Sequence, residues 1–296
     1  MNKMKVLILT NSHERHFYFV NELIKNTNVI GVITDGQRVF RTTREKIAYR
    51  LKKKEIWPLI RNSVLNTVFM HIKKALENET NNIEIKYFLG NKIRFEEKYS
   101  ALHLAQVLEP HRSINNEYYV KIIRQCNPDI IAVMGTCLLG KAIINSAPYV
   151  LNMHTGLSPY YRGGMSNLWP IIEGDYGKFG VTIHKMSLGI DSGDIIYSKR
   201  PEIIADDTYG SINSRCIKIG TKLMIRAIHD IENGKLHTVK QMIPGKLFNE
   251  RDFNGLVAYR YFQRINNFID TYKRLADKCE LPYAEEITDD DMGACK

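Results

Sequence analysis

The chain has 296 residues, of which 44% are hydrophobic and 25% charged, with a net charge of +10. This composition is typical of a globular protein that can bury a full core. No stretch reaches the roughly 20 apolar residues of a membrane span, and the apolar run Val6–Leu9 is too short for a signal peptide. Scattered cysteines without Cys-x-x-Cys spacing fit reduced thiols and indicate neither a zinc site nor a disulfide framework, so we expect a cytoplasmic protein without a metal; they are Cys126, Cys137, Cys216, Cys279 and Cys295.

The first 36 residues have the pattern of a strand–helix–strand unit. Residues 5–10 form a short apolar run that predicts a buried strand, and residues 29–34 predict the next one. The helix between them should start from a cap at Asn11 or Ser12 and run through Leu23. This unit favours a parallel sheet. The turn after the first strand contains no glycine, so the fingerprint of dinucleotide-binding proteins is absent.

Residues 37–110 are predicted to be a helical insertion, in which Pro58 should break or start a helix. Its residues 37–61 carry nine basic side chains against two acidic ones, a local balance of +7. Such a cluster could attract nucleic acid, an anionic membrane surface or a phosphorylated substrate, or could be a solvated helix face. The apolar positions that give the helical period are Ile47, Leu51, Ile56, Ile60, Val64, Val68 and Ile72.

After the insertion, helical and strand patterns alternate again. The predicted helices are residues 115–126, 141–145, 166–173 with Pro170 in its middle, and 210–233; the predicted strands are 128–135 after a turn, 149–154, 179–185, and 194–199, which should be half exposed. From residue 245 the chain is rich in aromatic residues at helical spacing, so one or two helices should pack on the core or on a partner. Residues 285–291 form an acidic tail.

Three side chains between residues 152 and 191 suggest acyl-group transfer. Asn152 and His154 lie two apart at the end of a predicted strand, so they should project to the same side. Asp191 lies in a turn between Gly189 and Gly193. An amide and an imidazole can stabilise a carbonyl oxygen that becomes negative, and a carboxylate can orient the imidazole or assist proton transfer.

The residues around these three side chains resemble a known family. LNMHTGLSPYYRGG at residues 151–164 and GVTIHKMSLGIDSGDII at residues 180–196 are similar to the paired motifs of 10-formyltetrahydrofolate-dependent formyltransferases. The resemblance covers residues 1–36 and 113–240. It implies an α/β, Rossmann-like domain with a mainly parallel sheet, and direct transfer of a formyl group from the folate to an amine. It assigns catalysis to Asn152, His154 and Asp191, with Asp194 as a nearby second carboxylate.

The resemblance also suggests domain boundaries and folate contacts. We expect a catalytic domain at residues 1–244, which includes the insertion, and a helical extension at residues 245–296. Folates of the family lie between two loops and contact mainly the main chain. In this sequence the expected contacts are Met134, Gly135, Thr136, Cys137, Leu138 and Leu139 on one loop, and Gly189, Ile190 and Asp194 on the other.

The acceptor amine is inferred by exclusion. Relatives that act on glycinamide ribonucleotide carry a glycine-rich loop after the first strand, and methionyl-tRNA formyltransferases append a barrel of about a hundred residues, where this sequence has about fifty. The remaining class resembles enzymes that formylate nucleotide-linked amino sugars for lipopolysaccharide or other surface glycans. A hydroxylamine, aminoacyl or tRNA-linked amine, and a non-catalytic folate-binding module, stay as alternatives. We expect a small-molecule acceptor rather than nucleic acid, and a homodimer is open; the expected acceptor contacts are His13, Arg15, His16, Tyr160, Tyr161, Arg162 and Gly163.

Overall fold

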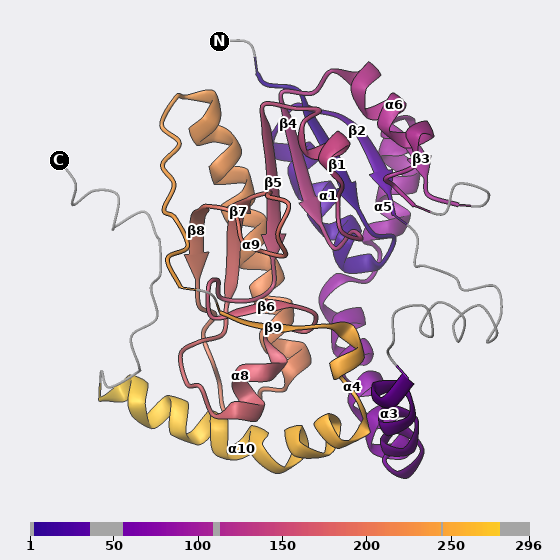
Figure 1. The fold of residues 1–296 in the computed structure, drawn as a ribbon. Helices are drawn as coiled ribbons and strands as arrows, with labels where there is room; N and C mark the ends of the chain where they lie inside the picture. The colour runs from indigo at the N-terminus through magenta and orange to yellow at the C-terminus, as the bar shows by residue number, and fades with distance from the viewer. Residues whose placement is uncertain (1–2, 36–55, 109–112, 244, 279–296) are drawn as a thin grey trace.

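A seven-stranded sheet forms the centre of the molecule. The computed structural model describes residues 3–35, 56–108, 113–243 and 245–278. The sheet order is β3-β2-β1-β4-β5-β7-β8 (Figure 1). The strands from β3 to β5 are parallel, whereas β7 runs antiparallel to both of its neighbours, so the expected mainly parallel α/β fold is confirmed. The strands are β1 (Val6–Thr10), β2 (Val29–Thr34), β3 (His103–Gln106), β4 (Ile130–Met134), β5 (Tyr149–His154), β7 (Val181–Lys185) and β8 (Ile195–Lys199).

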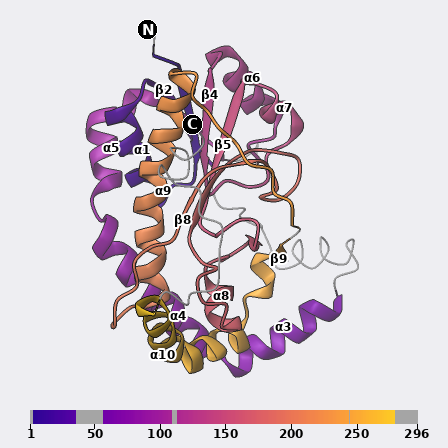
Figure 2. The ribbon, with the colours of Figure 1, turned by 90° about the vertical axis from the view of Figure 1, so that its left-hand side faces the viewer.

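Helices cover both faces of this sheet (Figure 2). On one face lie α1 (Glu14–Asn26), α5 (Asn91–Tyr99) and α9 (Tyr209–Glu232), and on the other lie α6 (Glu117–Cys126) and α7 (Lys141–Ile144). Every residue of β1 and β4 is therefore buried. The chain goes from β1 to β2 on one side of β1 and later reaches β4 on its other side, so the strand order reverses between β1 and β4.

A second group of elements lies beyond one end of the sheet and carries a separate apolar cluster. Its buried aromatic and aliphatic side chains include Trp169, Phe179, Tyr261 and Phe268, so the aromatic stripe of the C-terminal region forms core. The elements are α3 (Ile56–Val68), α4 (Met70–Phe88), β6 (Tyr161–Gly163), α8 (Leu168–Glu173), β9 (Lys246–Phe248) and α10 (Gly255–Asp277), with a short 3₁₀ turn at Glu250–Asp252. Another 3₁₀ turn, Ser100–Leu102, joins α5 to β3.

Three sequence expectations differ from the structure. The cap of α1 is His13, without a side-chain hydrogen bond, because the Asn11 side chain accepts from the neighbouring Ser12 N–H instead. The range 37–110, expected to be helical, includes the edge strand β3, which pairs with β2. The strand expected at 194–199 to be half exposed is β8 (Ile195–Lys199), whose first four residues are buried, since α9 packs against β8.

Other expectations on the helices agree with the structure or lie outside it. Pro170 is the third residue of α8, where a missing N–H costs no intrahelical hydrogen bond. Pro58 likewise lies in the first turn of α3. The positions Ile47 and Leu51, most of the basic cluster and the acidic tail lie outside the described residues. Among the helices that the structure describes, none is long and apolar enough to cross a membrane.

Candidate active site

The structure brings Asn152, His154 and Asp191 into one contact group. Asn152 and His154 lie two residues apart on β5, so strand alternation directs both toward the same side. Asp191 comes from the turn between β7 and β8, where its backbone adopts a left-handed conformation with φ of 45°. Because β7 runs antiparallel to β5, its end at Lys185 lies opposite Leu151 near the start of β5, and the turn after it folds back so that Asp191 reaches Asn152 and His154.

The carboxylate of Asp191 is the centre of this group. Its Oδ2 accepts a hydrogen bond from the backbone N–H of Gly163 at 2.9 Å and lies 3.4 Å from His154 Nδ1. Its Oδ1 accepts from Asn152 Nδ2 at 3.3 Å and lies 3.5 Å from His184 Nε2. The side chain is only 14% exposed, so these four contacts replace most of its hydration.

The neighbours of Asp191 stabilise its charged form, although the side chain is buried. Burial acts to raise the pKa of Asp191, but His154, His184 and the Gly163 N–H outweigh it and hold the pKa well below its usual range. The carboxylate is therefore ionised at neutral pH and is a weak base. It suits the orientation and stabilisation of a neighbouring imidazolium better than the removal of a proton.

His154 is buried with both ring nitrogens facing oxygen acceptors. Nδ1 faces Asp191, and Nε2 lies 3.1 Å from the carbonyl oxygen of Tyr161. The ring can donate to both oxygens only when both nitrogens carry hydrogen. Gly156 leaves room for this ring, since a Cβ at that position would lie 2.4 Å from His154 Nε2. The imidazole is thus held in one orientation from three sides.

His184 and Gln241 belong to the same group, although neither was predicted as a site residue. His184 stands opposite Asn152 in the β5–β7 register and is 1% exposed. Its Nδ1 donates to the Lys185 carbonyl at 2.8 Å, and its Nε2 lies 3.1 Å from Asn152 Nδ2 and 3.5 Å from Asp191 Oδ1. Gln241 donates to the carbonyls of Asp191 and Gly193 and fixes the turn. The strand register could have indicated His184, whereas nothing local in the sequence indicates Gln241.

The first expected folate loop leaves the end of β4. Met134 is buried, and its carbonyl accepts a hydrogen bond from Thr10 Oγ1 at 2.9 Å. Gly135 has φ of 69°, and a Cβ there would lie 2.5 Å from the ring of His16. Cys137 donates its backbone N–H to the buried Asp35 at 2.8 Å. The loop is therefore held by the ends of β1 and β2 and by α1.

The remaining residues of this loop differ in exposure. The Thr136 hydroxyl donates to the Cys137 carbonyl at 3.0 Å. Leu139 is buried in the apolar cluster on the α6 side, whereas Leu138 is 65% exposed. Cys137, Cys126 and Cys216 form no disulfide with one another.

The second expected folate loop is the turn that carries Asp191. Gly189 has no room for a side chain, because a Cβ there would lie 2.2 Å from the Ser192 hydroxyl. Ile190 and Asp194 are half-buried, and the Asp194 carbonyl accepts from the Lys185 N–H. Leu188 is strongly exposed at the tip. Both loops contact one apolar cluster, through Met186 here and Cys137 on the first loop.

The expected acceptor residues on α1 are already engaged by protein groups. Arg15 Nη1 donates to both carboxylate oxygens of Glu84 on α4, at 2.6 and 2.5 Å. His16 is buried below Gly135, and burial holds its pKa well below the usual value, with Arg15 and His13 adding to the shift. Burial also lowers the pKa of His13. The two histidines are therefore neutral at pH 7.

The loop that contains Tyr160 to Gly163 directs its side chains away from Asp191. The ring of Tyr161 is buried in the second apolar cluster, and its hydroxyl donates to Glu173 at 2.8 Å and also to Asp175, so only its carbonyl reaches His154. Arg162 Nη2 donates to the Gly245 carbonyl at 3.1 Å. Tyr160 has the Lys178 ammonium over its ring.

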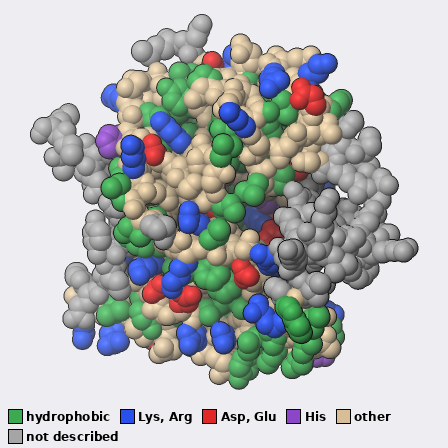
Figure 3. All heavy atoms as spheres, in the orientation of Figure 1, with side chains coloured by type: hydrophobic (Ala, Val, Ile, Leu, Met, Phe, Trp, Pro, Cys, Tyr) green, Lys and Arg blue, Asp and Glu red, His purple; other side chains and the backbone are tan. Residues whose placement is uncertain are grey.

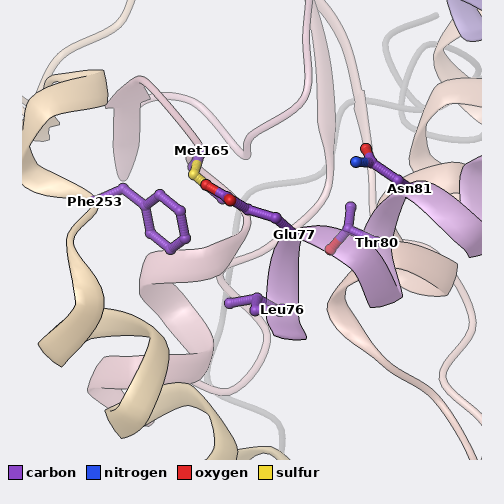
Figure 4. A pocket seen from close by; sticks show the side chains of 6 residues that line it. All are labelled: Leu76, Glu77, Thr80, Asn81, Met165 and Phe253. Atoms are coloured by element: carbon purple, nitrogen blue, oxygen red, sulfur yellow. The ribbon is translucent and has the colours of Figure 1, made fainter. Parts of the chain in front are cut away.

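A separate hollow of about 210 Å³ lies near this loop (Figure 4). It is lined by apolar and uncharged side chains and by the carboxylate of Glu77, and it has no cationic lining residue, so it does not suit a diphosphate. Within the described parts of the chain, no group of three or more His, Cys, Asp or Glu side chains is arranged to hold a metal ion. The lining residues are Leu76, Glu77, Thr80, Asn81, Met165 and Phe253.

Solved structures of formyltransferases have a similar fold. A 4-N formyltransferase from Francisella tularensis superposes with a TM-score of 0.54 at 16% identity, over 85% of this chain and 79% of its own. A sugar 3N-formyl transferase solved with dTDP and 5-N-formyl-THF superposes with a TM-score of 0.51 at 16% identity, over 86% of this chain and 72% of its own. Phosphoribosylglycinamide formyltransferase from Streptococcus pneumoniae superposes with a TM-score of 0.50 at 15% identity, over 77% of this chain and 99% of its own. At these identities the likeness concerns the fold.

Sequence comparison finds relatives of higher identity than these solved structures. Methionyl-tRNA formyltransferase from Lachnospira eligens is 34% identical over 170 residues, which are 54% of this chain and 53% of the relative. The enzyme of the same name from Halothermothrix orenii is 36% identical over 131 residues, 44% of this chain and 41% of its own. The chain thus spans about half the length of these curated relatives. The family model described as formyl transferase matches residues 4–228, and this chain therefore belongs to the formyl transferase family.

Proposed function

We propose that the protein transfers a formyl group from 10-formyltetrahydrofolate to a primary amine. The observation that carries this proposal is the contact group of Asn152, His154 and Asp191, which lies within the range matched by the family model. A structural role alone does not explain a buried carboxylate surrounded by an amide, two imidazoles and a backbone N–H at the end of a strand.

The reaction needs an environment for a carbonyl oxygen that becomes negative. The amine nitrogen forms a bond to the formyl carbon, the bond from that carbon to the folate nitrogen breaks, and a proton passes from the amine to the departing folate nitrogen. Asn152 Nδ2 and His154 Nε2 would donate to the formyl oxygen, and each would then exchange or share its present partner. Asp191 fixes the His154 ring and would stabilise a positive charge on it. A formyl oxygen at His154 Nε2 would compete with the Tyr161 carbonyl, which occupies that nitrogen at 3.1 Å.

The two loops beside the contact group suit a folate. The exposed Leu138 and Leu188 are apolar contacts for a flat ring, and the backbones of Gly135 and Gly189 are accessible because neither carries a side chain. We propose that residues 134–139 and 189–190, together with Asp194, form the folate site. Asp35 and His16 would support it from below through Cys137 and Gly135.

For the acceptor we propose an amino sugar linked to a nucleotide, as in surface polysaccharide synthesis. Two observations support a small acceptor over tRNA. The residues after 245 are packed against the catalytic loop, with β9 paired to β6 and α10 against α8, so the described part of this segment is used within the fold. In addition, Arg162 reaches the start of that segment at Gly245, beside the catalytic strand. The scattered cysteines favour a reducing compartment, and we propose that the reaction takes place in the cytoplasm.

A tRNA-linked amine is the second candidate. It is favoured by the sequence relationship to methionyl-tRNA formyltransferases and by the basic balance of residues 37–61. We also propose residues 1–244 as the catalytic unit and residues 245–296 as an extension that supports it.

The test compares candidate acceptors in separate reactions. The purified chain is incubated with 10-formyltetrahydrofolate and, in parallel, with dTDP- and UDP-linked amino sugars, methionyl-tRNA, glycinamide ribonucleotide and free amines. Release of tetrahydrofolate is followed by absorbance, and the formylated product is identified by mass spectrometry. We expect formamide formation on an amino sugar, and none with the matched control Asp191→Asn. Turnover on methionyl-tRNA alone would replace the sugar proposal, and formamide formation on no amine would contradict formyl transfer.

A further inference from the structure

Helix α3 exposes the apolar side chains that a helix normally buries. Trp57 is 80% exposed, Val68 68% and Val64 56%, and Ile60 is exposed as well. Steps of three, four and four residues place these side chains along one face of the helix. We call these four residues the α3 stripe. In the orientation of Figure 1, hydrophobic side chains gather at the lower right of the molecular surface, where α3 lies (Figure 3).

The inner side of α3 is held by polar side chains instead. Asn62 is buried, donates to the Arg251 carbonyl at 2.8 Å, and accepts from the Asn254 amide at 3.3 Å. Asn66 accepts from the backbone N–H of Gly255 at 3.0 Å. These hydrogen bonds hold the polar side of α3 against the first turn of α10. The usual arrangement of an amphipathic surface helix is therefore reversed, and the stripe is fixed outward.

The surroundings of the stripe are basic. From Ile56 to Glu77 the sequence contains three basic residues, Arg61, Lys73 and Lys74, and one acidic residue, Glu77; Glu250 and Asp252 flank Arg251, whose carbonyl accepts from Asn62. Arg61 and Lys74 are exposed, while Lys73 lies 3.8 Å from Glu77. In sequence, this region directly follows residues 37–55, which carry eight basic side chains and two acidic ones. The partner of the stripe should therefore be apolar and negatively charged at once.

We propose that the α3 stripe docks peripherally on an anionic lipid bilayer. A helix that lies in a membrane interface needs an apolar face and basic side chains near it, and an exposed Trp suits the headgroup boundary. The stripe and its basic surroundings provide these features.

A second copy of the chain is a poorer partner for this surface. A helix of 13 residues is about 20 Å long, and four side chains fall well short of the roughly 20–30 residues per side of a stable interface. Two copies would also bring the same excess of positive charge together. A bilayer has neither difficulty, because it needs no shape complementarity and its anionic headgroups attract the basic residues.

Trp57 is a built-in probe for this proposal. The chain contains two tryptophans, and the other, Trp169, is buried and stacked on Phe248. The full-length protein is mixed with vesicles of phosphatidylcholine alone or with phosphatidylglycerol added. We expect a blue shift of the fluorescence and flotation of the protein with the anionic vesicles only, both weakened by salt. The variant Trp57→Phe should abolish the shift and keep the flotation.

A pair of variants on the same helix tests the stripe itself. The double variant Val64→Ser and Val68→Ser should weaken vesicle binding by about tenfold or more, because each loses apolar contact with the lipid. The control Ser63→Ala and Thr67→Ala changes exposed side chains beside the stripe and should bind as the wild type does. Since all four side chains are exposed, formyl transfer and the unfolding midpoint should be unchanged in both. Binding that is absent, equal on neutral vesicles, or insensitive to the stripe variant would overturn the proposal. A dimer that this variant dissociates, without vesicle binding, would assign the stripe to a second copy.

Discussion

Replacing Asp191 with Asn removes the charge at the centre of the contact group and leaves its shape. Asn tolerates the left-handed backbone found at this position, so the turn can be kept. The carboxylate accepts from Gly163 at 2.9 Å and from Asn152 at 3.3 Å, with two imidazoles at 3.4 and 3.5 Å. A hydrogen bond to a charged group contributes about 1.5–3 kcal/mol. Because the Asn amide keeps one accepting oxygen, we expect the free energy of unfolding to fall by about 2–4 kcal/mol at pH 7.

The pH dependence of this loss gives the decisive check. The pKa of Asp191 is lower in the folded protein than the roughly 3.9 of an unfolded chain, so its stabilisation is complete above about pH 4 and is lost as the pH falls through the folded pKa. Urea unfolding of both proteins from pH 7 to pH 3 should show a constant difference above pH 4 and a smaller one below. A difference that is absent at pH 7, or that does not shrink in acid, would refute the account of Asp191 as a stabilised anion.

Four further substitutions test the parts of the site separately. Asn152→Ala and His154→Ala should each lower kcat by about 10²–10⁴ while folate binding, measured by calorimetry, stays near that of the wild type; normal turnover in both would remove them from catalysis. Asp35→Asn loses the charge that holds the Cys137 N–H, so we expect folate affinity to fall by about tenfold with kcat little changed, and an unchanged affinity would count against the supporting role. Gly163→Ala introduces a side chain at φ of 88° and 2.0 Å from a backbone oxygen of β9, which should lower the unfolding midpoint measured by scanning calorimetry; a midpoint equal to that of the wild type would contradict the close packing.

The parallel part of the fold is well predicted by sequence because burial there follows the chain locally. The strands β1 and β4 are apolar runs that are buried on both faces, and the pattern needs no knowledge of distant residues. The predicted exposure of residues 194–199 was wrong, because their alternation of apolar and polar side chains suggests one exposed face. In the structure Tyr197 and Ser198 are both buried, and Tyr197 donates to Asp230 of α9. A distant helix decides this burial.

In the candidate site too, local patterns predict some residues, whereas others depend on distant parts of the chain. Asn152, His154 and Asp191 could be predicted because strand alternation and the Gly-flanked turn are local features. The contacts of Gln241 with the Asp191 and Gly193 carbonyls depend on a segment some fifty residues away, and no local pattern indicates them. His184 lies between these cases, since its position follows once β7 is known to pair with β5 in antiparallel register.

The pairing of β6 with β9 limits how the C-terminal region of this protein can be exchanged. Gly163, whose N–H binds Asp191, lies on β6, and Gly245 is so close to Pro159 that a Cβ there would lie 1.5 Å from the Pro159 carbonyl oxygen. The loop at residues 159–164 is thus shaped against a segment about eighty residues further along the chain. A chimera that joins the sheet domain to another C-terminal region near residue 240 would place foreign residues against that loop. Graftable units in this protein must therefore carry residues 159–164 and 245–250 from the same parent.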